Sequence, residues 1–194
     1  MSEDSGVLRP LRSSDSPAVL AAFQSTDDMA RQGHVTTLSE AESYVSRLVD
    51  PAGVHRAFAI TDADLLVGLV VVSLDRDNLV GWFWYWMSRS HRNRGWTGRA
   101  AATIADWALR DGGVHRLELG HRADNPASAG VALAAGFVRE GVEREKFLID
   151  GERVDVVTYG RLPSDPWPSA PAVLPGENSV RIATAATATA PEGP

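Results

Sequence analysis

The sequence predicts one α/β (α+β) domain with a mixed, mostly antiparallel sheet flanked by helices, followed by a tail. Across residues 1–162, apolar residues recur at helical spacing in some segments and alternate with period two in others. The resulting order is β-α-α-β-β-β-α-β-α-β-β. With 194 residues, 44% of them hydrophobic, the chain has the composition of a single globular domain. After residue 162 the composition changes abruptly, which marks the expected end of the domain.

The segment from Pro163 to Pro194 is predicted to be a flexible tail. It holds seven of the chain's 11 prolines, and most of its other residues are Ala, Gly, Ser or Thr. Such a segment has too few large apolar side chains to form a core. An alternative is that Ser179–Thr184 adds a strand to a sheet edge, either its own or a partner's.

One strand and two helices are expected first. Val7–Arg12 has the pattern of a short strand, and Ser16-Pro17 places an N-cap before a proline at the first helical position, opening a helix over Ala18–Gln24. Thr37-Leu38-Ser39-Glu40 has the spacing of a capping box. It predicts a second helix that continues to about Val49, before Asp50-Pro51-Ala52-Gly53 ends it.

Three strands should follow. Arg56–Thr61 and Leu65–Leu74 are predicted to form a hairpin around Asp62-Ala63-Asp64, and Leu79–Ser88 forms the third strand. Side chains alternate between the two faces of a strand. One face of the third strand is therefore expected to carry Trp82, Trp84 and Trp86, and the opposite face Phe83 and Tyr85.

The second half of the domain repeats strand and helix signals. Small and apolar residues at helical spacing predict a helix from Thr97 or Gly98 to Arg110. His115–His121 is the next expected strand. Asn125-Pro126 again places a capping residue before a proline, so a short helix should begin there and end at Gly136-Phe137.

A hairpin is expected to close the domain. Its strands are Val142–Ile149 and Arg153–Arg161, joined around Asp150-Gly151, a dipeptide suited to a type I′ turn. In a regular strand Glu143 and Glu145 would lie on the same face.

A basic loop precedes the predicted helix that ends at Arg110. Residues 78–105 contain four arginines and no Asp or Glu, in a chain of net charge -6; they are Arg89, Arg92, Arg94 and Arg99. Gly95 and Gly98 allow a tight turn, and the first N–H groups of a helix point toward an anion. The pattern predicts a local phosphate site, and it is too short for a nucleic-acid track.

Several other classes of function are disfavoured by the sequence. The chain has no Cys, and its five histidines show no paired spacing typical of zinc, so no metal is expected; they are His34, His55, His91, His115 and His121. No Gly-x-x-x-x-Gly-Lys-Ser/Thr loop of a nucleotide triphosphatase is present. The first residues lack the pattern of a signal peptide, and the apolar runs fall below the ~18 residues that span a bilayer. We therefore expect a cytoplasmic protein without membrane or nucleic-acid partners.

An ordered set of motifs resembles the GNAT superfamily of acyl-CoA-dependent N-acyltransferases. The motifs are Arg92-x-x-Gly95-x-Thr97, then Asn125-x-x-Ser128, then Gly136-Phe137-x-x-Glu140-Gly141. The subgroup that the chain resembles most is the RimJ/RimL type, which acetylates protein N-termini and, in relatives, other amines. The resemblance extends from Val7 to Leu162. It implies a GNAT-type fold and acetyl-CoA, or another short acyl-CoA, as cofactor.

The resemblance also implies which residues hold the cofactor. The pyrophosphate should be wrapped by the loop and the helix start, namely by Arg92, Arg94, Gly95, Trp96, Thr97, Gly98 and Arg99. Thr97 departs from the family's usual Gly or Ala. The backbone of Met87 and Ser88 should pair with the cofactor's amides, and the Asn125 side chain should contact it. Asn125 would cap the following helix in any case.

Catalytic roles are implied less directly. Ala132 stands where many family members carry a tyrosine that protonates the departing thiolate, so Ser128 is expected to assist the sulfur. The subgroup places a glutamate base on the strand after Gly141, but Phe147 occupies that position. We expect Glu145, or else Glu143, to act as base. Glu118, His34, or placement of the reactants with no strong base are alternatives.

The acceptor side is predicted from the aromatic strand and from subgroup positions. Trp82 and Trp84 either pack in the core or line a pocket for an amine. The loop from Asp27 to His34 should shape access, and its paired aspartates could attract a protonated amine. Arg144, Asp155 and Tyr159 resemble positions that lie near the acceptor cleft in the subgroup. Asp155 could instead anchor the hairpin.

Three functions remain open on the sequence. The first is an acetyl-CoA-dependent N-acetyltransferase acting on a protein or peptide α-amine. The second is acetylation of a small amine such as an antibiotic, a polyamine or an amino acid. The third is an acyl-CoA-binding module without turnover. A monomer or a homodimer would suit each of them.

Overall fold

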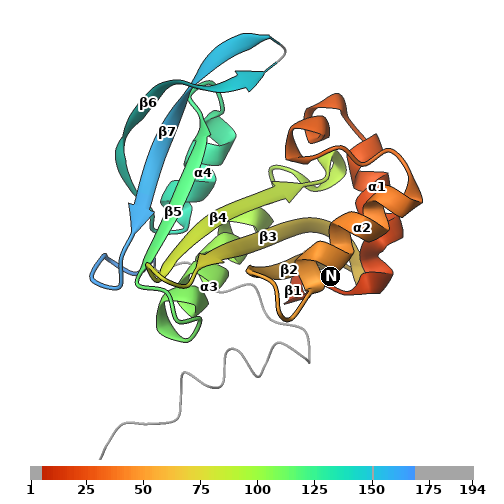
Figure 1. The fold of residues 1–194 in the computed structure, drawn as a ribbon, viewed down its shortest axis with the longest axis horizontal. Helices are drawn as coiled ribbons and strands as arrows, with labels where there is room; N and C mark the ends of the chain where they lie inside the picture. Colours follow the sequence, from red (N-terminus) through yellow and green to blue (C-terminus); the bar gives the residue numbers. More distant parts are fainter. Residues whose placement is uncertain (1–5, 150, 169–194) are drawn as a thin grey trace, which may run out of the picture.

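The computed structural model describes residues 6–149 and 151–168, and these form one twisted sheet covered by helices (Figure 1). The strands are β1 (Val7–Pro10), β2 (His55–Asp62), β3 (Leu65–Asp75), β4 (Val80–Met87), β5 (Arg116–Arg122), β6 (Val138–Ile149) and β7 (Glu152–Arg161). The α-helices are α1 (Ser16–Gln24), α2 (Leu38–Val49), α3 (Trp96–Arg110) and α4 (Pro126–Ala134). Short 3-10 turns form η1 (Ser13–Asp15), η2 (Asp27–Gln32) and η3 (Arg89–His91). The predicted order of strands and α-helices is confirmed.

The strands lie in the order β1-β2-β3-β4-β5-β7-β6, and all neighbours are antiparallel except β4 and β5. Helices α1 and α2 cover one face, while α3 and α4 lie on the other (Figure 1). This arrangement makes two apolar cores, one on each side of the sheet. The expectation of a mixed, mostly antiparallel sheet flanked by helices is confirmed.

Strand β4 supplies both cores by alternation. Phe83 is buried on the α3 side, and Trp86 is buried on the α1/α2 side. Trp84 packs against the same core as Trp86, and Tyr85 against the same core as Phe83. The predicted two-face distribution of the aromatic side chains is therefore confirmed for these four residues.

Strands β4 and β5 pair only at their beginnings and then part. Their parallel register covers Val80–Trp82 against Arg116–Glu118. Beyond this point β4 continues to pair with β3, and β5 with β7, so one edge of each strand is left open toward the other. Gly81 lies at the junction, where an added Cβ would come within 2.8 Å of Leu117 and 2.7 Å of Val72. The split in the sheet is the main feature of the fold that creates a site.

The helix starts are set by local capping, with one difference from the prediction at α1. The Thr37–Glu40 capping box forms as expected. Helix α1, however, begins at Ser16 with Asp15 as N-cap, because Asp15 accepts the backbone N–H of Arg12 in a preceding 3-10 turn. Asp15 is also held in a buried ion pair with Arg9, 2.7 Å long. No local sequence pattern predicted this pair.

The closing hairpin is less regular than expected. Strand β6 begins at Val138, four residues earlier than predicted, and its register with β7 is irregular between Glu143 and Phe147. Within this bulge Glu145 has φ +53°, and its N–H donates to Asp155 Oδ1 at 2.8 Å. The expectation that Glu143 and Glu145 alternate on one regular face is therefore wrong. Asp150 of the predicted turn lies outside the described residues.

The packed domain continues past Leu162. The Trp167 ring lies 4.0 Å from the guanidinium carbon of Arg110 and 4.9 Å from that of Arg161. It packs against the core on the α3 side. The remainder of the predicted tail, including Ser179–Thr184, lies outside the described residues. In the part of the chain that the structure describes, no helix combines the length and apolar character needed to cross a bilayer.

Candidate functional site

A cavity of about 1780 Å³ occupies the split between β4 and β5. The cavity is also lined by residues of the first turns of α3 and α4, of η2, of α2 and of the β6–β7 hairpin. Typical small-ligand pockets occupy roughly 300–1,000 Å³. The cavity is therefore larger than a typical pocket for one small ligand.

The first turn of α3 forms one wall of the cavity. Gly95 precedes the helix with φ +74°, a left-handed conformation that favours glycine. A Cβ added at Gly95 would meet no atom within 4 Å, so this side of the loop faces open space. First-turn amides have no acceptor within their own helix, and Thr97 and Gly98 of this turn line the cavity. An anion site at this helix start therefore stays a prediction, and Thr97 and Gly98 are the first-turn residues in position to form it.

Trp96 has a second role that the sequence did not indicate. Its side chain is 2% exposed and belongs to the core on the α3 side. An added Cβ at Gly6 would lie 2.6 Å from this ring, so Gly6 lets the N-terminal strand pass over it. The Arg94 guanidinium stacks 5.3 Å from the ring centre. Burial of Trp96 fixes the start of α3 and with it the position of the predicted anion site.

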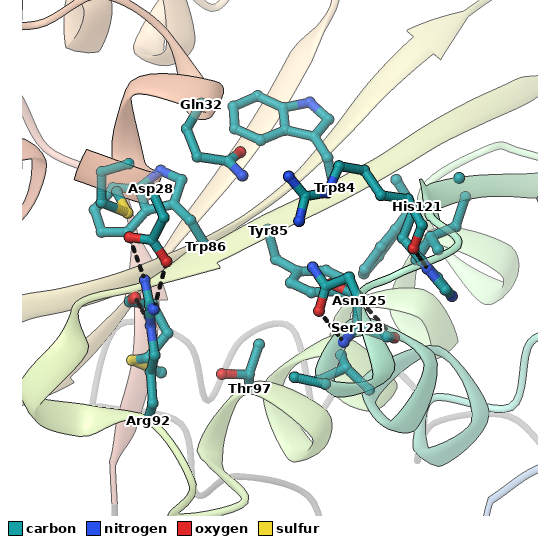
Figure 2. Close-up of a pocket in the computed structure, with 18 of the residues that line it drawn as sticks. Asp28, Gln32, Trp84, Tyr85, Trp86, Arg92, Thr97, His121, Asn125 and Ser128 are labelled. Carbon is teal, nitrogen blue, oxygen red and sulfur yellow. Dashed lines mark hydrogen bonds and ion pairs between the residues drawn. The ribbon is translucent and has the colours of Figure 1, made fainter. Parts of the chain in front are cut away.

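Arg92 is engaged by the protein itself. Its guanidinium forms a bidentate ion pair with Asp28 of η2, at 2.6 and 3.2 Å, and its Nε donates to the Met87 carbonyl at 3.0 Å. Figure 2 shows the two side chains facing each other across one side of the cavity. Arg92 therefore ties η2 to the end of β4. The charge of Asp28 is matched by this pair, which weakens the expectation that Asp27 and Asp28 together attract an ammonium group.

The end of β4 offers fewer free groups than expected. Met87 lines the cavity, but its carbonyl already accepts from Arg92. The Ser88 N–H donates to the Val67 carbonyl at 2.8 Å, and its hydroxyl lies 3.2 Å from His91 Nδ1. Ser88 is buried and does not line the cavity. Backbone groups for a ligand must therefore come from the open edge of β4 before Ser88.

The first turn of α4 forms the opposite wall. Asn125 Oδ1 accepts the Ser128 N–H at 3.1 Å, so its side chain caps the helix, and both residues line the cavity. Figure 2 places Thr97 between Arg92 on one side and Ser128 on the other. Gly130 also lines the cavity, and an added Cβ there would meet nothing within 4 Å. Ala132, in contrast, is fully buried in the core.

Tyr85 brings a phenol to this wall, whereas the sequence pattern predicted only its face on the strand. Its hydroxyl donates to the Ser128 carbonyl at 3.1 Å and lines the same cavity. Burial raises the pKa of Tyr85 to about 12. The phenol therefore keeps its proton at neutral pH. Its proximity to Ser128 could be found only once β4 and α4 were placed in space.

The α1/α2 side of the cavity has an aromatic wall. Trp82 and Trp84 both line it, with Trp82 38% exposed. Trp84 Nε1 donates to Ser73 Oγ at 3.1 Å, and Trp86 Nε1 donates to Tyr44 OH at 3.2 Å. All three tryptophans line the cavity; Trp86 is also part of the core on the α1/α2 side, and Trp84 packs against that core. An acceptor role for these rings stays a prediction.

Other residues proposed from the sequence lie away from the cavity. Tyr159 is buried in the core and donates to His121 Nε2 at 3.2 Å, since His121 Nδ1 donates to the Arg122 carbonyl. Asp155 anchors the bulge in β6. The residues that do not line the cavity are Ser88, His34, Glu143, Arg144, Glu145, Asp155 and Tyr159. Neither glutamate proposed as base therefore faces the space where the reactants would meet. Among the described residues, no group of three possible metal ligands gathers.

Comparisons with known proteins agree with this geometry. A family model described as "Acetyltransferase (GNAT) domain" matches residues 7–138. A ribosomal-protein-serine acetyltransferase of Escherichia coli (strain K12) is 28% identical over 114 residues, covering 57% of this chain and 62% of the relative. The chain thus spans less than two thirds of that relative.

Solved structures share the fold, and two of them are ribosomal-protein acetyltransferases. A ribosomal-protein-S5-alanine acetyltransferase from Vibrio fischeri superposes with a TM-score of 0.76 and 22% identity, covering 86% of this chain and 97% of that one. A ribosomal L7/L12 alpha-N-protein acetyltransferase in complex with coenzyme A superposes with a TM-score of 0.74 and 21% identity. The match covers 84% of this chain and 96% of that one.

Proposed function

The chain belongs to the GNAT acetyltransferase family, and on this premise we propose that it transfers an acetyl group from acetyl-CoA to a primary amine, namely a protein or peptide N-terminal α-amine. The observation that carries the proposal is the split between β4 and β5, which opens onto the first turn of α3. The named relatives that act on ribosomal proteins support the acceptor class.

The residues present fit the cofactor. Main-chain donors at Thr97 and Gly98, with Arg94 and Arg99 beside them, suit a diphosphate. The open edges of β4 and β5 suit an extended chain with amide groups, since exposed strand edges bind such ligands. The complex of one structural relative with coenzyme A supports this choice. Acetyl-CoA supplies the activated acetyl thioester.

Two side chains are proposed to act at the departing sulfur. The Ser128 hydroxyl is kept as the primary candidate because its helix turn is fixed by Asn125 and faces the cavity. Tyr85 is the second, because its protonated phenol lies against the Ser128 carbonyl. A phenol with pKa about 12 is a hydrogen-bond donor to a developing thiolate and a weak acid toward it.

The proton on the attacking ammonium needs a different account. The glutamates Glu143 and Glu145 do not line the cavity. We therefore propose that placement of the two reactants supplies most of the rate and that the proton leaves to solvent through the open cavity. Orientation alone contributes on the order of 7–11 kcal/mol in well-placed reactions.

The decisive experiment compares two glycines of the same conformation. Gly95 and Gly113 flank α3 at opposite ends, with φ +74° and +78°, and neither has an atom within 4 Å of an added Cβ. Each Gly→Ala change should cost a similar ~1 kcal/mol in stability. Only Gly95→Ala places its methyl at the cavity, so it should weaken coenzyme A binding measured by calorimetry.

Turnover is tested separately. Incubation with acetyl-CoA and N-terminal peptides should release thiol and produce α-acetylated peptide detectable by mass spectrometry. Binding of coenzyme A without thiol release for any amine would favour a binding module instead. Equal coenzyme A affinity in both glycine variants would overturn the assignment of the anion site to the start of α3.

A further inference from the structure

Beyond the arginines of the phosphate loop, four positive side chains line the cavity from four different elements. They are Arg47 on α2, Arg122 on β5, Lys146 on β6 and Arg153 on β7. These elements are far apart in sequence, and no motif links the four positions. The cations converge only because the split sheet, α2 and the closing hairpin enclose one space.

Negative side chains do not balance this group. Among the described residues that line the cavity, the carboxylates are Asp27 and Asp28, and Asp28 is held by Arg92. Lys146 pairs with Glu143, and Arg122 pairs with Asp124 at 2.9 Å. Neither of these two partners lines the cavity. The Lys146–Glu143 pair is exposed on both sides and is therefore weak, so Lys146 remains available to a ligand. The Arg122 side chain is 19% exposed, and its partner Asp124 lies mostly in solvent.

One of the cations stands beside the aromatic wall. On β5, Leu117 and Leu119 face the core on the α3 side, so Gly120 and Arg122 face the α1/α2 side. An added Cβ at Gly120 would lie 3.2 Å from the Trp82 ring, which places this ring against the same face of β5. Arg122 thus follows two residues after the point of contact with Trp82. A peptide acceptor held against the aromatic wall would therefore place its following residues near the Arg122 guanidinium.

The charge of this region bears directly on the acceptor. The chain as a whole has a net charge of -6, so a cavity rich in arginine and lysine runs against its average. Such a cavity repels polyamines and basic peptides and attracts carboxylates. Guanidinium groups in particular bind carboxylates in a bidentate manner.

We propose that the acceptor is an acidic peptide N-terminus, with Asp or Glu side chains within the first few residues after the acetylated amine. The inference rests on the proposed acetyl transfer and adds the substrate class to it. Arg47, Arg122, Lys146 and Arg153 are the residues that select these carboxylates. The aromatic surface of Trp82 and Trp84 receives the apolar part of the peptide.

The test uses three peptides of equal length that share their first residue and differ at residues two to four. One carries Glu and Asp there, one carries Gln and Asn, and one carries Lys and Arg. Initial rates of thiol release should give a kcat/KM for the acidic peptide about tenfold above the neutral one, since several exposed charge pairs together reach that size. The basic peptide should be the poorest substrate.

Charge-reversal variants locate the effect. Lys146→Glu/Arg153→Glu acts on the hairpin, and Arg47→Glu acts on α2, so the two variants probe the cavity independently. Each should lower the ratio of acidic to neutral kcat/KM and raise the rate with the basic peptide. Arg139→Gln removes an exposed arginine of β6 that does not line the cavity, and it should leave the ratio unchanged.

The outcomes separate this inference from the proposed function. If the neutral and acidic peptides react equally, or the basic peptide reacts best, the inference fails while acetyl transfer stands. If the reversal variants lose coenzyme A affinity with no change in peptide preference, the cations serve the cofactor and the inference again fails. If no peptide releases thiol, the proposed function fails first.

Discussion

The two halves of the sheet differ in how many of their faces are covered. In the β1–β4 half, helices α1 and α2 pack on one face and α3 on the other, and β3 has seven consecutive buried residues from Leu66 to Val72. In the β5–β7 half, α4 covers one face, and no residue of β6 is fully buried. The first half therefore has a packed core on both faces, whereas the second half has one core face, and β6 leaves a surface that is free to bind.

The largest expected difference is in the free energy of unfolding lost when a phenylalanine of each half is replaced by alanine. Phe83 on β4 is 1% exposed, whereas Phe147 on β6 is only partly buried and lines the cavity. Phe83→Ala should destabilise the protein by about 3–5 kcal/mol because it leaves a cavity in a packed core. Phe147→Ala should cost less than about 1 kcal/mol. Urea unfolding followed by tryptophan fluorescence measures both.

The activity of the same two variants sharpens the comparison. Phe147→Ala should change the KM for a peptide acceptor, since the ring faces the cavity. Similar stability losses in the two variants would contradict this contrast between the two halves of the sheet.

A smaller effect is expected from the two helix caps, one in each half. Thr37 caps α2 away from the cavity, and Asn125 caps α4 at its wall. Thr37→Ala and Asn125→Ala should each cost about 1 kcal/mol of stability. Only Asn125→Ala should also weaken coenzyme A binding, by roughly fivefold for one lost hydrogen bond. Calorimetric titration of both variants checks this, and unaltered binding by Asn125→Ala would leave that side chain with a capping role alone.

The smallest expected effect is a pH dependence confined to the β1–β4 half. Hydrogen bonds from Thr36 and Thr37 lower the pKa of Glu40 from 4.5 to about 2. Because the folded pKa is depressed, the stabilisation is complete above pH 4.5 and is lost as the pH falls toward 2. Melting temperatures of the wild type and Glu40→Gln should therefore differ at pH 7 and converge near pH 2. A constant difference across this range would rule out ionisation of Glu40 as its source.

Local signals accounted for most of the elements. The Thr37–Glu40 box and Asn125-Pro126 placed the starts of α2 and α4 correctly, because capping depends on residues within one helical turn. Alternation along β4 predicted which aromatic residues share a face. The bulge at Glu145 escaped prediction, because it depends on the register with β7 and on a hydrogen bond to Asp155 ten residues away.

The sequence by itself determined the order of elements, the loop ahead of α3 and the family resemblance, since all of these depend on residues close together in the chain. Only the tertiary structure decided that Arg92 is bound by Asp28, that Tyr85 meets Ser128, and that four distant cations face one cavity. These features arise where β4 and β5 separate. The separation depends on each strand pairing with a different neighbour, and such long-range pairing cannot be deduced from local patterns.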